Sequence, residues 1–289
     1  MRRLSFDKRT HQKIDSRTRY QMKSVQRFSG RVAVVTGGAS GIGAAIVTQL
    51  LAEGASVVIG DIDPARAAEL IGQNGAERLA FQRCDVKAGT DLEALIKLAE
   101  EKFGGLDLMF NNAGTGVVPA RVTEADPADW HRVMAVNVDS VFYGCRHAVP
   151  ALRRRGGGAI VNTASICGLG GDPGLFAYNA SKGAVINYTR TLALDHAREN
   201  IRVNAICPGF ISTPLTAHIE QTPLGPVWKE SIPMGRFGKA SEIAEAALFL
   251  ASDAASYVTG TTLIADGGLM AYTGQPNLLA AMQAAGSTI

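Results

Sequence analysis

The chain has 289 residues, of which 46% are hydrophobic and 19% are charged. This composition indicates a globular protein that is long enough to bury a full core. No run reaches the roughly eighteen apolar residues of a membrane-spanning helix, and residues 1–30 hold no apolar block of the secretory kind. We therefore expect a cytoplasmic protein with no membrane partner.

Basic residues are concentrated in the first thirty positions. Nine Lys or Arg and two Asp fall there, so this segment carries +7 and, since the whole chain carries +3, the remainder carries −4. A mildly acidic body disfavours nucleic acid as a partner of the folded part. We expect residues 1–28 to form a basic, disordered tail. Its residues 1–21 admit a transit peptide, a nucleic-acid arm or a mistaken translation start ahead of Met22, and we favour the last.

Expected strands and helices alternate along residues 31–270. After the first strand comes a helix over 41–54, and Asp63 followed by Pro64 is typical of an N-cap and first-turn proline. The expected strands are 31–36, 56–60, 79–81, 106–110, 158–164, 201–207 and 261–265. Strands that alternate with helices form crossover units, which build a parallel sheet covered on both faces. We expect one doubly wound α/β domain over 29–270, with about seven strands, and a C-terminal extension over 271–289.

A glycine-rich loop, "TGGASGIG", lies between the first strand and the first helix. Gly37, Gly41 and Gly43 stand where the chain must turn tightly, let a pyrophosphate approach the backbone and pack helix on strand. The helix N-terminus offers amide donors to phosphates. The spacing GxxxGxG differs from GxGxxG, and no Lys-Ser/Thr pair follows as in a Walker loop. The loop favours a Rossmann-type dinucleotide site, with an ordinary tight turn as the alternative.

Two aspartates follow the next two strands. Asp61 stands eighteen residues after Gly43, where its carboxylate can accept both ribose hydroxyls of NAD and repel a 2′-phosphate. The alternative for Asp61 is a turn residue or helix cap. Asp85, after the third strand, is a candidate for the adenine amino group. The motif "NNAG" at 111–114 puts small residues where the fourth strand would pass the cofactor.

The stretch "SICGLGGDPGLFAYNASK" ends in a Tyr-x-x-x-Lys pair. Tyr178 and Lys182 are four positions apart, so on a helix they lie on the same face. Ser165 ends a strand thirteen residues before Tyr178. Because ligands of parallel sheets bind beyond the carboxyl ends of the strands, Ser165, "NNAG" and the glycine loop are expected to meet in one crevice.

These motifs, taken in order, resemble those of the short-chain dehydrogenase/reductases over about residues 29–270. The resemblance rests on "TGxxxGxG", the two aspartates, "NNAG", Asn137, Ser165, YxxxK and "PGFIST" at 208–213. It implies that Ser165 polarises a substrate oxygen and that Tyr178 acts as general acid/base. Tyrosine has an ordinary pKa near 10, so Lys182 and a positive nicotinamide are expected to lower the pKa of Tyr178.

The resemblance also assigns supporting roles. Lys182 is expected to hold the nicotinamide ribose, and Asn137 to anchor a water that links Lys182 to solvent, the alternative for Asn137 being a polar helix residue. Ile211 and Thr213 are expected to orient the carboxamide. The full set of expected cofactor contacts is Gly37, Ser40, Gly41, Ile42, Gly43, Asp61, Ile62, Asp85, Val86, Asn112, Ala113, Gly114, Tyr178, Lys182, Pro208, Gly209, Ile211 and Thr213. The cofactor is expected to be NAD, and no metal is expected because the His and Cys spacings match no metal motif.

The expected activity is NAD-dependent interconversion of a small secondary alcohol and its ketone. "NTASICGLGGD" and "DGGLMAYTGQP" are similar to stretches of bacterial acyloin and 2,3-butanediol dehydrogenases, which suggests a vicinal diol or acyloin. A 3-oxoacyl reductase of fatty-acid type and a non-catalytic NAD-binding regulator are the alternatives. The family also implies a homotetramer, in which the helices bearing Asn137 and Tyr178 pair across twofold axes.

Overall fold

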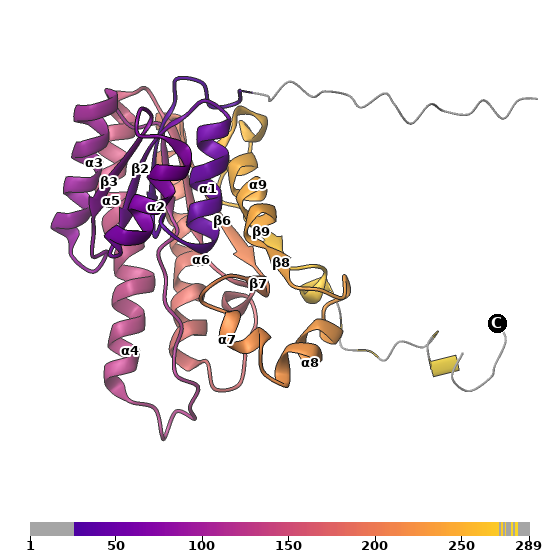
Figure 1. Ribbon diagram of the computed structural model, residues 1–289. Helices are drawn as coiled ribbons and strands as arrows, with labels where there is room; N and C mark the ends of the chain where they lie inside the picture. The colour runs from indigo at the N-terminus through magenta and orange to yellow at the C-terminus, as the bar shows by residue number, and fades with distance from the viewer. Residues whose placement is uncertain (1–25, 272, 274, 276–278, 280, 283–289) are drawn as a thin grey trace, which may run out of the picture.

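The computed structural model describes residues 26–271 together with residues 273, 275, 279, 281 and 282 (Figure 1). Residues 1–25 of the expected tail, with the proposed start at Met22, and most of the expected extension over 271–289 lie outside the described residues. Phe28 is only 2% exposed, and Arg27 forms ion pairs with Glu53 and Glu245. The folded body therefore begins a few residues before the expected boundary at residue 29.

Seven parallel strands form one sheet in the order β3-β2-β1-β4-β5-β6-β9, as expected from the alternating pattern. The strands are β1 (Val32–Thr36), β2 (Ser56–Asp61), β3 (Leu79–Arg83), β4 (Leu108–Asn111), β5 (Gly158–Thr163), β6 (Ile201–Pro208) and β9 (Thr262–Ala265). A separate pair joins β7 (Ile211–Ser212) to β8 (Gly238–Lys239). The doubly wound α/β class is confirmed.

Helices cover both faces of the sheet (Figure 1). They are α1 (Gly41–Ala52), α2 (Pro64–Asn74), α3 (Gly89–Phe103), α4 (Pro127–Met134), α5 (Ser140–Arg154), α6 (Phe176–His196), α7 (Ala217–Glu220), α8 (Leu224–Ser231) and α9 (Ala240–Ala251). Helices α1, α2 and α9 share one hydrophobic core with the sheet, and α3, α5 and α6 share the other. Among the described residues, no helix is both long and apolar enough to cross a bilayer.

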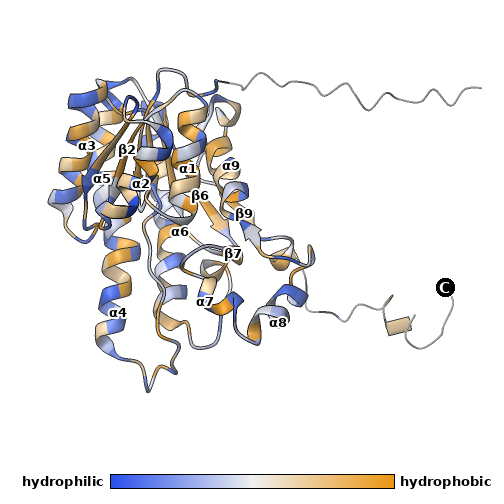
Figure 2. Cartoon of the chain, viewed as in Figure 1, coloured by the Kyte–Doolittle hydropathy of each residue, from blue (hydrophilic) through white to orange (hydrophobic). Residues whose placement is uncertain are grey.

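The strand sequences explain why the sheet is buried on both sides. In β1, Val32 and Val34 belong to the core beneath α3, whereas Ala33 and Val35 belong to the core beneath α1. Successive side chains of a strand point to opposite faces, so a strand covered on both faces reads as a continuous apolar run. Figure 2 shows β2 and β6 as largely hydrophobic, while blue and orange alternate along α3. Each fully buried Val or Leu contributes about 1.5–3 kcal/mol.

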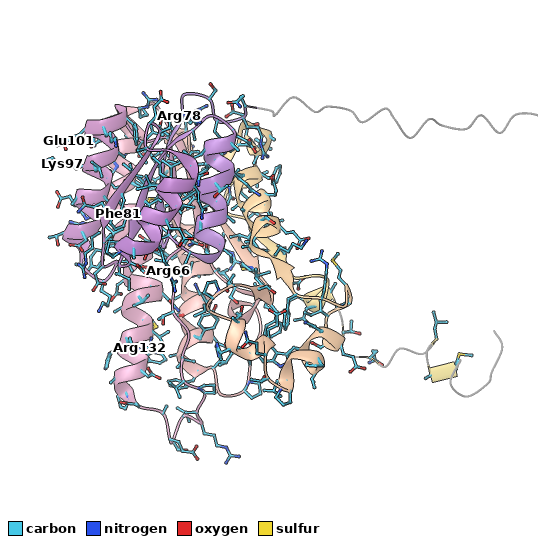
Figure 3. All side chains as sticks on the ribbon, viewed as in Figure 1. Arg66, Arg78, Phe81, Lys97, Glu101 and Arg132 are labelled. Atoms are coloured by element: carbon cyan, nitrogen blue, oxygen red, sulfur yellow. The ribbon has the colours of Figure 1, made fainter. Side chains whose placement is uncertain are left out.

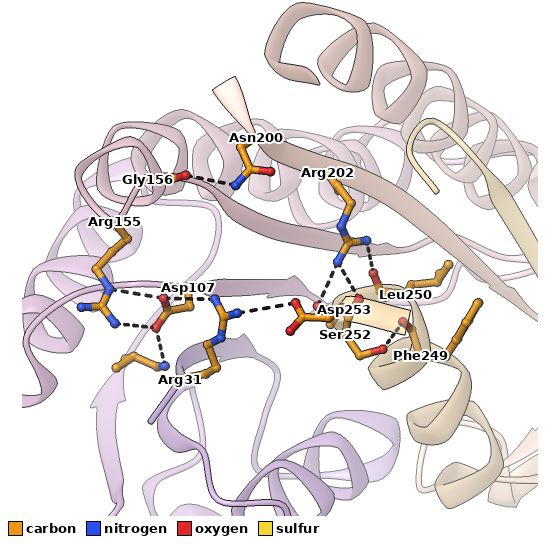
Figure 4. Close-up of polar contacts among 12 residues, drawn as sticks. Arg31, Asp107, Arg155, Gly156, Asn200, Arg202, Phe249, Leu250, Ser252 and Asp253 are labelled. Carbon is orange, nitrogen blue, oxygen red and sulfur yellow. Dashed lines mark hydrogen bonds and ion pairs between the residues drawn. The ribbon is translucent and has the colours of Figure 1, made fainter. Parts of the chain in front are cut away.

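An ionic network closes the amino ends of the strands (Figure 4). The buried carboxylate of Asp107 accepts a hydrogen bond from the Val32 N–H at 2.8 Å. Arg155 donates two hydrogen bonds of 3.2 Å to that carboxylate, and Arg31 lies 3.7 Å from it. Nearby, Arg202 of β6 donates to main-chain carbonyl oxygens at the end of α9. These contacts tie β1, β4 and β6 to the helices at this end of the sheet.

The opposite, carboxyl ends of the strands carry the site. The strand order reverses direction between β1 and β4, so the loops that follow these two strands diverge and leave a crevice. Helices α4, α7 and α8 extend beyond this end of the sheet (Figure 1). The fold therefore provides one open crevice, with the glycine loop on one side and the segment of α7 and α8 on the other.

Candidate active site

A cavity of about 450 Å³ opens at the carboxyl ends of the strands. The residues expected from the sequence that line it are Gly37, Ser40, Gly41, Ile42, Asn112, Ala113, Gly114, Ser165, Tyr178, Lys182, Pro208, Gly209, Ile211 and Thr213. The glycine loop, the segment after β4, the end of β5 and the start of α6 thus meet in one place, as the carboxyl-end rule indicates.

The glycine loop has the shape of a phosphate cradle. Gly41 has φ +53°, a conformation that few other residues adopt, and a Cβ on Gly43 would overlap the carbonyl oxygen of Gly37. No acidic side chain stands in the first turn of α1, and the Ser40 side chain makes no capping hydrogen bond. The first amides of α1 are therefore left to bind an anion, so this loop fits the pyrophosphate of a dinucleotide.

Asp61 is bonded to the glycine loop. Its carboxylate accepts a hydrogen bond from the Ala39 N–H at 3.0 Å and another from the Asp63 N–H at 3.1 Å. Each carboxylate oxygen can accept a further hydrogen bond. The side chain therefore shapes the loop and can still accept hydrogen bonds from ribose hydroxyls. The structure is thus compatible with both the turn role and the ribose-binding role that the sequence left open for Asp61.

Some of the expected residues lie outside the cavity lining. Gly43 lies beneath the glycine loop against Gly37, Ile62 is 63% exposed, and Val86 is buried in the core at 7% exposure. Asp85 forms an ion pair with Lys87 at 3.4 Å. Asp61 and Asn137 also lie outside this lining, and all the expected cofactor contacts stay predictions.

Lys182 and Ser165 are fixed by the end of β5. The buried ammonium of Lys182 donates a hydrogen bond to the Thr163 carbonyl oxygen at 2.8 Å. It lies 5.7 Å from the centre of the Tyr178 ring. The Ser165 hydroxyl accepts a hydrogen bond from the Cys167 N–H at 3.2 Å. The side chains of Lys182, Tyr178 and Ser165 thus all line the cavity.

The pKa of Tyr178 differs in direction from the expectation. Burial raises the pKa of the Tyr178 phenol to about 12, although a hydrogen bond with Ser165 partly lowers it. Burial also lowers the pKa of the Lys182 ammonium to about 8. In the protein alone, burial of the phenol therefore outweighs any lowering of the Tyr178 pKa by the nearby Lys182 ammonium.

Asn137 lies in a π-helical turn, Ala135–Asp139, that joins α4 to α5. Its side-chain oxygen accepts from the Thr115 N–H at 2.8 Å, and its amide nitrogen donates to the Thr115 carbonyl and to the Ser181 hydroxyl, both at 3.0 Å. Both N–H donors are therefore engaged with protein groups. Asn137 thus connects the segment after β4 to α6. A bound water would have to donate a hydrogen bond to the side-chain or main-chain oxygen of Asn137.

The sequence reasoning missed several lining residues. Thr115 follows "NNAG" directly, and Thr216 hydrogen-bonds the Ile211 carbonyl at 2.5 Å, which anchors the chain beyond Thr213. Arg66, in the first turn of α2, also lines the cavity. Its position at the carboxyl edge of the sheet was a signal for this. Within the part of the chain that the structure describes, no three His, Cys, Asp or Glu side chains are grouped to hold a metal ion.

The site can be compared with known proteins. A protein-family model described as enoyl-(acyl carrier protein) reductase matches residues 37–270. The chain is 41% identical over 249 residues to 2-(R)-hydroxypropyl-CoM dehydrogenase of Xanthobacter autotrophicus, covering 84% of this chain and 98% of that protein. It is 37% identical over 253 residues to meso-2,3-butanediol dehydrogenase of Serratia marcescens, covering 88% and 100%. The crystal structure of gox2181 superposes with a TM-score of 0.83 at 33% identity, covering 86% of this chain and 99% of that one.

Proposed function

Because the chain belongs to the short-chain dehydrogenase/reductase family and is an oxidoreductase that acts on CH–OH groups, we propose that it interconverts a small secondary alcohol and its ketone with NAD. The observation that carries this proposal is the convergence of Ser165, Tyr178 and Lys182 on the cavity that also holds the glycine loop. A phosphate cradle and a proton-transfer group in one cavity are what hydride transfer to a carbonyl requires.

The proton transfer is assigned to Tyr178. During ketone reduction its phenol donates a proton to the substrate oxygen, and during alcohol oxidation the phenolate takes that proton back. The Ser165 hydroxyl donates a hydrogen bond to the same oxygen and so stabilises the charge that develops there. The nicotinamide, when bound, supplies or accepts the hydride. Lys182 holds the nicotinamide ribose and, being a cation at neutral pH, favours the phenolate.

The proposed substrate is small and uncharged. Leu215 and Pro214 contribute apolar surface to the cavity. The names of the two relatives above refer to a diol and a hydroxyalkyl compound, both secondary alcohols. These observations favour a small secondary alcohol, such as a vicinal diol or acyloin, over a long acyl chain on a carrier protein.

The test is an assay of NADH oxidation with a panel of acetoin, butanedione, cyclohexanone and an acetoacetyl thioester. We expect turnover of the small ketones and diketones. Turnover of the thioester alone would replace the proposal with a 3-oxoacyl reductase. Tight NADH binding without turnover of any compound would favour the non-catalytic regulator. The presence of both Tyr178 and Lys182 argues against that alternative.

The pH dependence should differ between the two directions. Since burial raises the pKa of Tyr178 to about 12, the phenol stays protonated at neutral pH and serves ketone reduction without a pH dependence between about pH 6 and 7, below the pKa of Lys182. Alcohol oxidation needs the phenolate, so its kcat/KM should rise by up to about tenfold per pH unit over that range. Steady-state rates in both directions at constant ionic strength measure this. An oxidation rate that does not change between these pH values would contradict the assignment of Tyr178 as the base.

We propose that the enzyme works as a cytoplasmic homotetramer. Phe142 on α5 is 43% exposed and Leu194 on α6 is 82% exposed, although both are large and apolar. These two helices bear the faces that the family pairs across a twofold axis, and exposed apolar side chains on such faces favour closed symmetric assembly. Light scattering at micromolar concentration should give four times the mass of one chain. Leu194→Lys should lower that mass, and a monomeric unmodified protein would refute the proposal.

A further inference from the structure

Arg66 brings a second cation to the cavity. Of the described residues that line the cavity, only Arg66 and Lys182 are basic, and none is acidic. Arg66 is the third residue of α2 and lies at the end of that helix that faces the site, as its label in Figure 3 shows. Ser40 and Gly41 of the glycine loop line the same cavity, as does Pro214. A positive charge therefore stands beside the amides that begin α1.

The guanidinium of Arg66 is held on one side only. Asp63, the N-cap of α2, accepts hydrogen bonds from the main-chain N–H groups of Ala65 and Arg66 at 3.0 and 3.2 Å. The Nε of Arg66 lies 3.3 Å from the other Asp63 carboxylate oxygen. In the described chain, the two terminal nitrogens of Arg66 have no ion-pair or hydrogen-bond partner. The two N–H-bearing ends of the fork are thus left for a ligand, and this geometry matches phosphate oxygens.

The surroundings of Arg66 favour an anion on the cavity side. A smaller cavity of about 290 Å³ adjoins the first, and Arg66, Ser40 and Pro214 line both. Glu69 lines only the smaller one. The carboxylate of Asp63 offsets part of the charge of Arg66 but stands at the start of the helix, among the groups it caps. A phosphate in the larger cavity would meet Arg66 and the amides of α1 without a carboxylate in the lining.

We propose that Arg66 binds the pyrophosphate of the dinucleotide beside the amides that begin α1 and so sets the affinity for the cofactor. This inference rests on the proposed function, because it takes the ligand of the cavity to be a dinucleotide. Arg66 is a binding residue here and takes no part in proton transfer. A 2′-phosphate on the adenosine ribose offers the same chemistry, so the experiment separates these two sources of phosphate.

The experiment measures binding by calorimetry for NADH, ADP-ribose and 2′-phospho-ADP-ribose. Arg66→Gln should weaken NADH and ADP-ribose about five- to tenfold, the scale of a charge-assisted hydrogen bond at a half-exposed site. Arg66→Lys keeps the charge but loses the forked guanidinium, so its affinities for these ligands should lie between those of the unmodified protein and those of Arg66→Gln. The control is Lys97→Gln, which removes the same charge from α3, where Lys97 pairs with Glu101 away from the site (Figure 3). This control should leave all three affinities unchanged.

The salt dependence of ligand binding tests whether Arg66 acts through its charge, because a purely structural role of Arg66 would not change this dependence. The affinity of the unmodified protein for ADP-ribose should fall more steeply with NaCl, up to about 0.5 M, than that of Arg66→Gln. ADP-ribose affinities of Arg66→Gln and the unmodified protein that agree within about twofold would overturn the inference. A loss confined to 2′-phospho-ADP-ribose would overturn it too, since Arg66 would then contact the 2′-phosphate. If the unmodified protein binds none of the three ligands, the proposed function fails as well.

Discussion

Replacing Tyr178 with Phe is expected to lower turnover at least about a hundredfold, the usual scale of an acid/base contribution. Phe keeps the ring that fills the buried site but removes the hydroxyl that exchanges a proton with the substrate oxygen. Loss of one hydrogen bond with Ser165 should leave the fold intact. Steady-state rates of NADH oxidation with the best ketone of the panel measure the loss.

A matched variant controls for the loss of any phenol on this helix. Tyr188 is also on α6, but its ring packs against Phe142, with centroids 6.5 Å apart, and it does not line the cavity. Tyr188→Phe should keep the rate of the unmodified enzyme. NADH binding followed by fluorescence should be unchanged in both variants. A Tyr178→Phe enzyme that retains nearly full turnover would remove Tyr178 from the proposed mechanism.

The second large effect is the choice of cofactor. Asp61 places a carboxylate at the end of β2, and a 2′-phosphate brought within about 4 Å of it would cost on the order of several kcal/mol. We therefore expect kcat/KM for NADH to exceed that for NADPH by two or more decades. Initial rates with both cofactors and one ketone measure it.

Asp61→Ala should narrow that preference, mainly by losing affinity for NADH. The structure supplies a second reason for the loss, because Asp61 also holds the glycine loop through the Ala39 N–H. Asp61→Asn keeps an acceptor for that bond without the negative charge, and so separates repulsion from loop geometry. Equal use of NADPH by the unmodified enzyme would show that Asp61 points away from the ribose, and the assignment of NAD would be withdrawn.

The sequence was informative where chemistry follows from spacing and strand ends. Tyr178 and Lys182 share a helix face because they are four residues apart, and Ser165 lies near them because it follows the carboxyl end of β5. The sheet was predictable because β1 and its neighbours are apolar on both faces, and crossover connections leave few topologies.

The rest depended on tertiary contacts that no local pattern encodes. The pKa of Tyr178 is raised because segments distant in sequence bury the ring. The side chain of Asn137 forms hydrogen bonds with Thr115 and Ser181, and no spacing rule predicts these contacts. Arg66 reaches the cavity only because the N-terminus of α2 lies against the glycine loop, whose own residues include no Lys or Arg.

The sheet keeps its ionic network and its cavity at opposite ends of the same strands. β5 alone is six residues long, which at about 3.3 Å per residue separates Asp107 and its partners from Ser165 by roughly 20 Å. Free-energy effects of substitutions that far apart usually add. Replacements at the cavity mouth that change the substrate can also destabilise the fold. Stabilising replacements around Asp107 can then restore stability without altering the active site. The architecture therefore allows substrate specificity and fold stability to evolve independently.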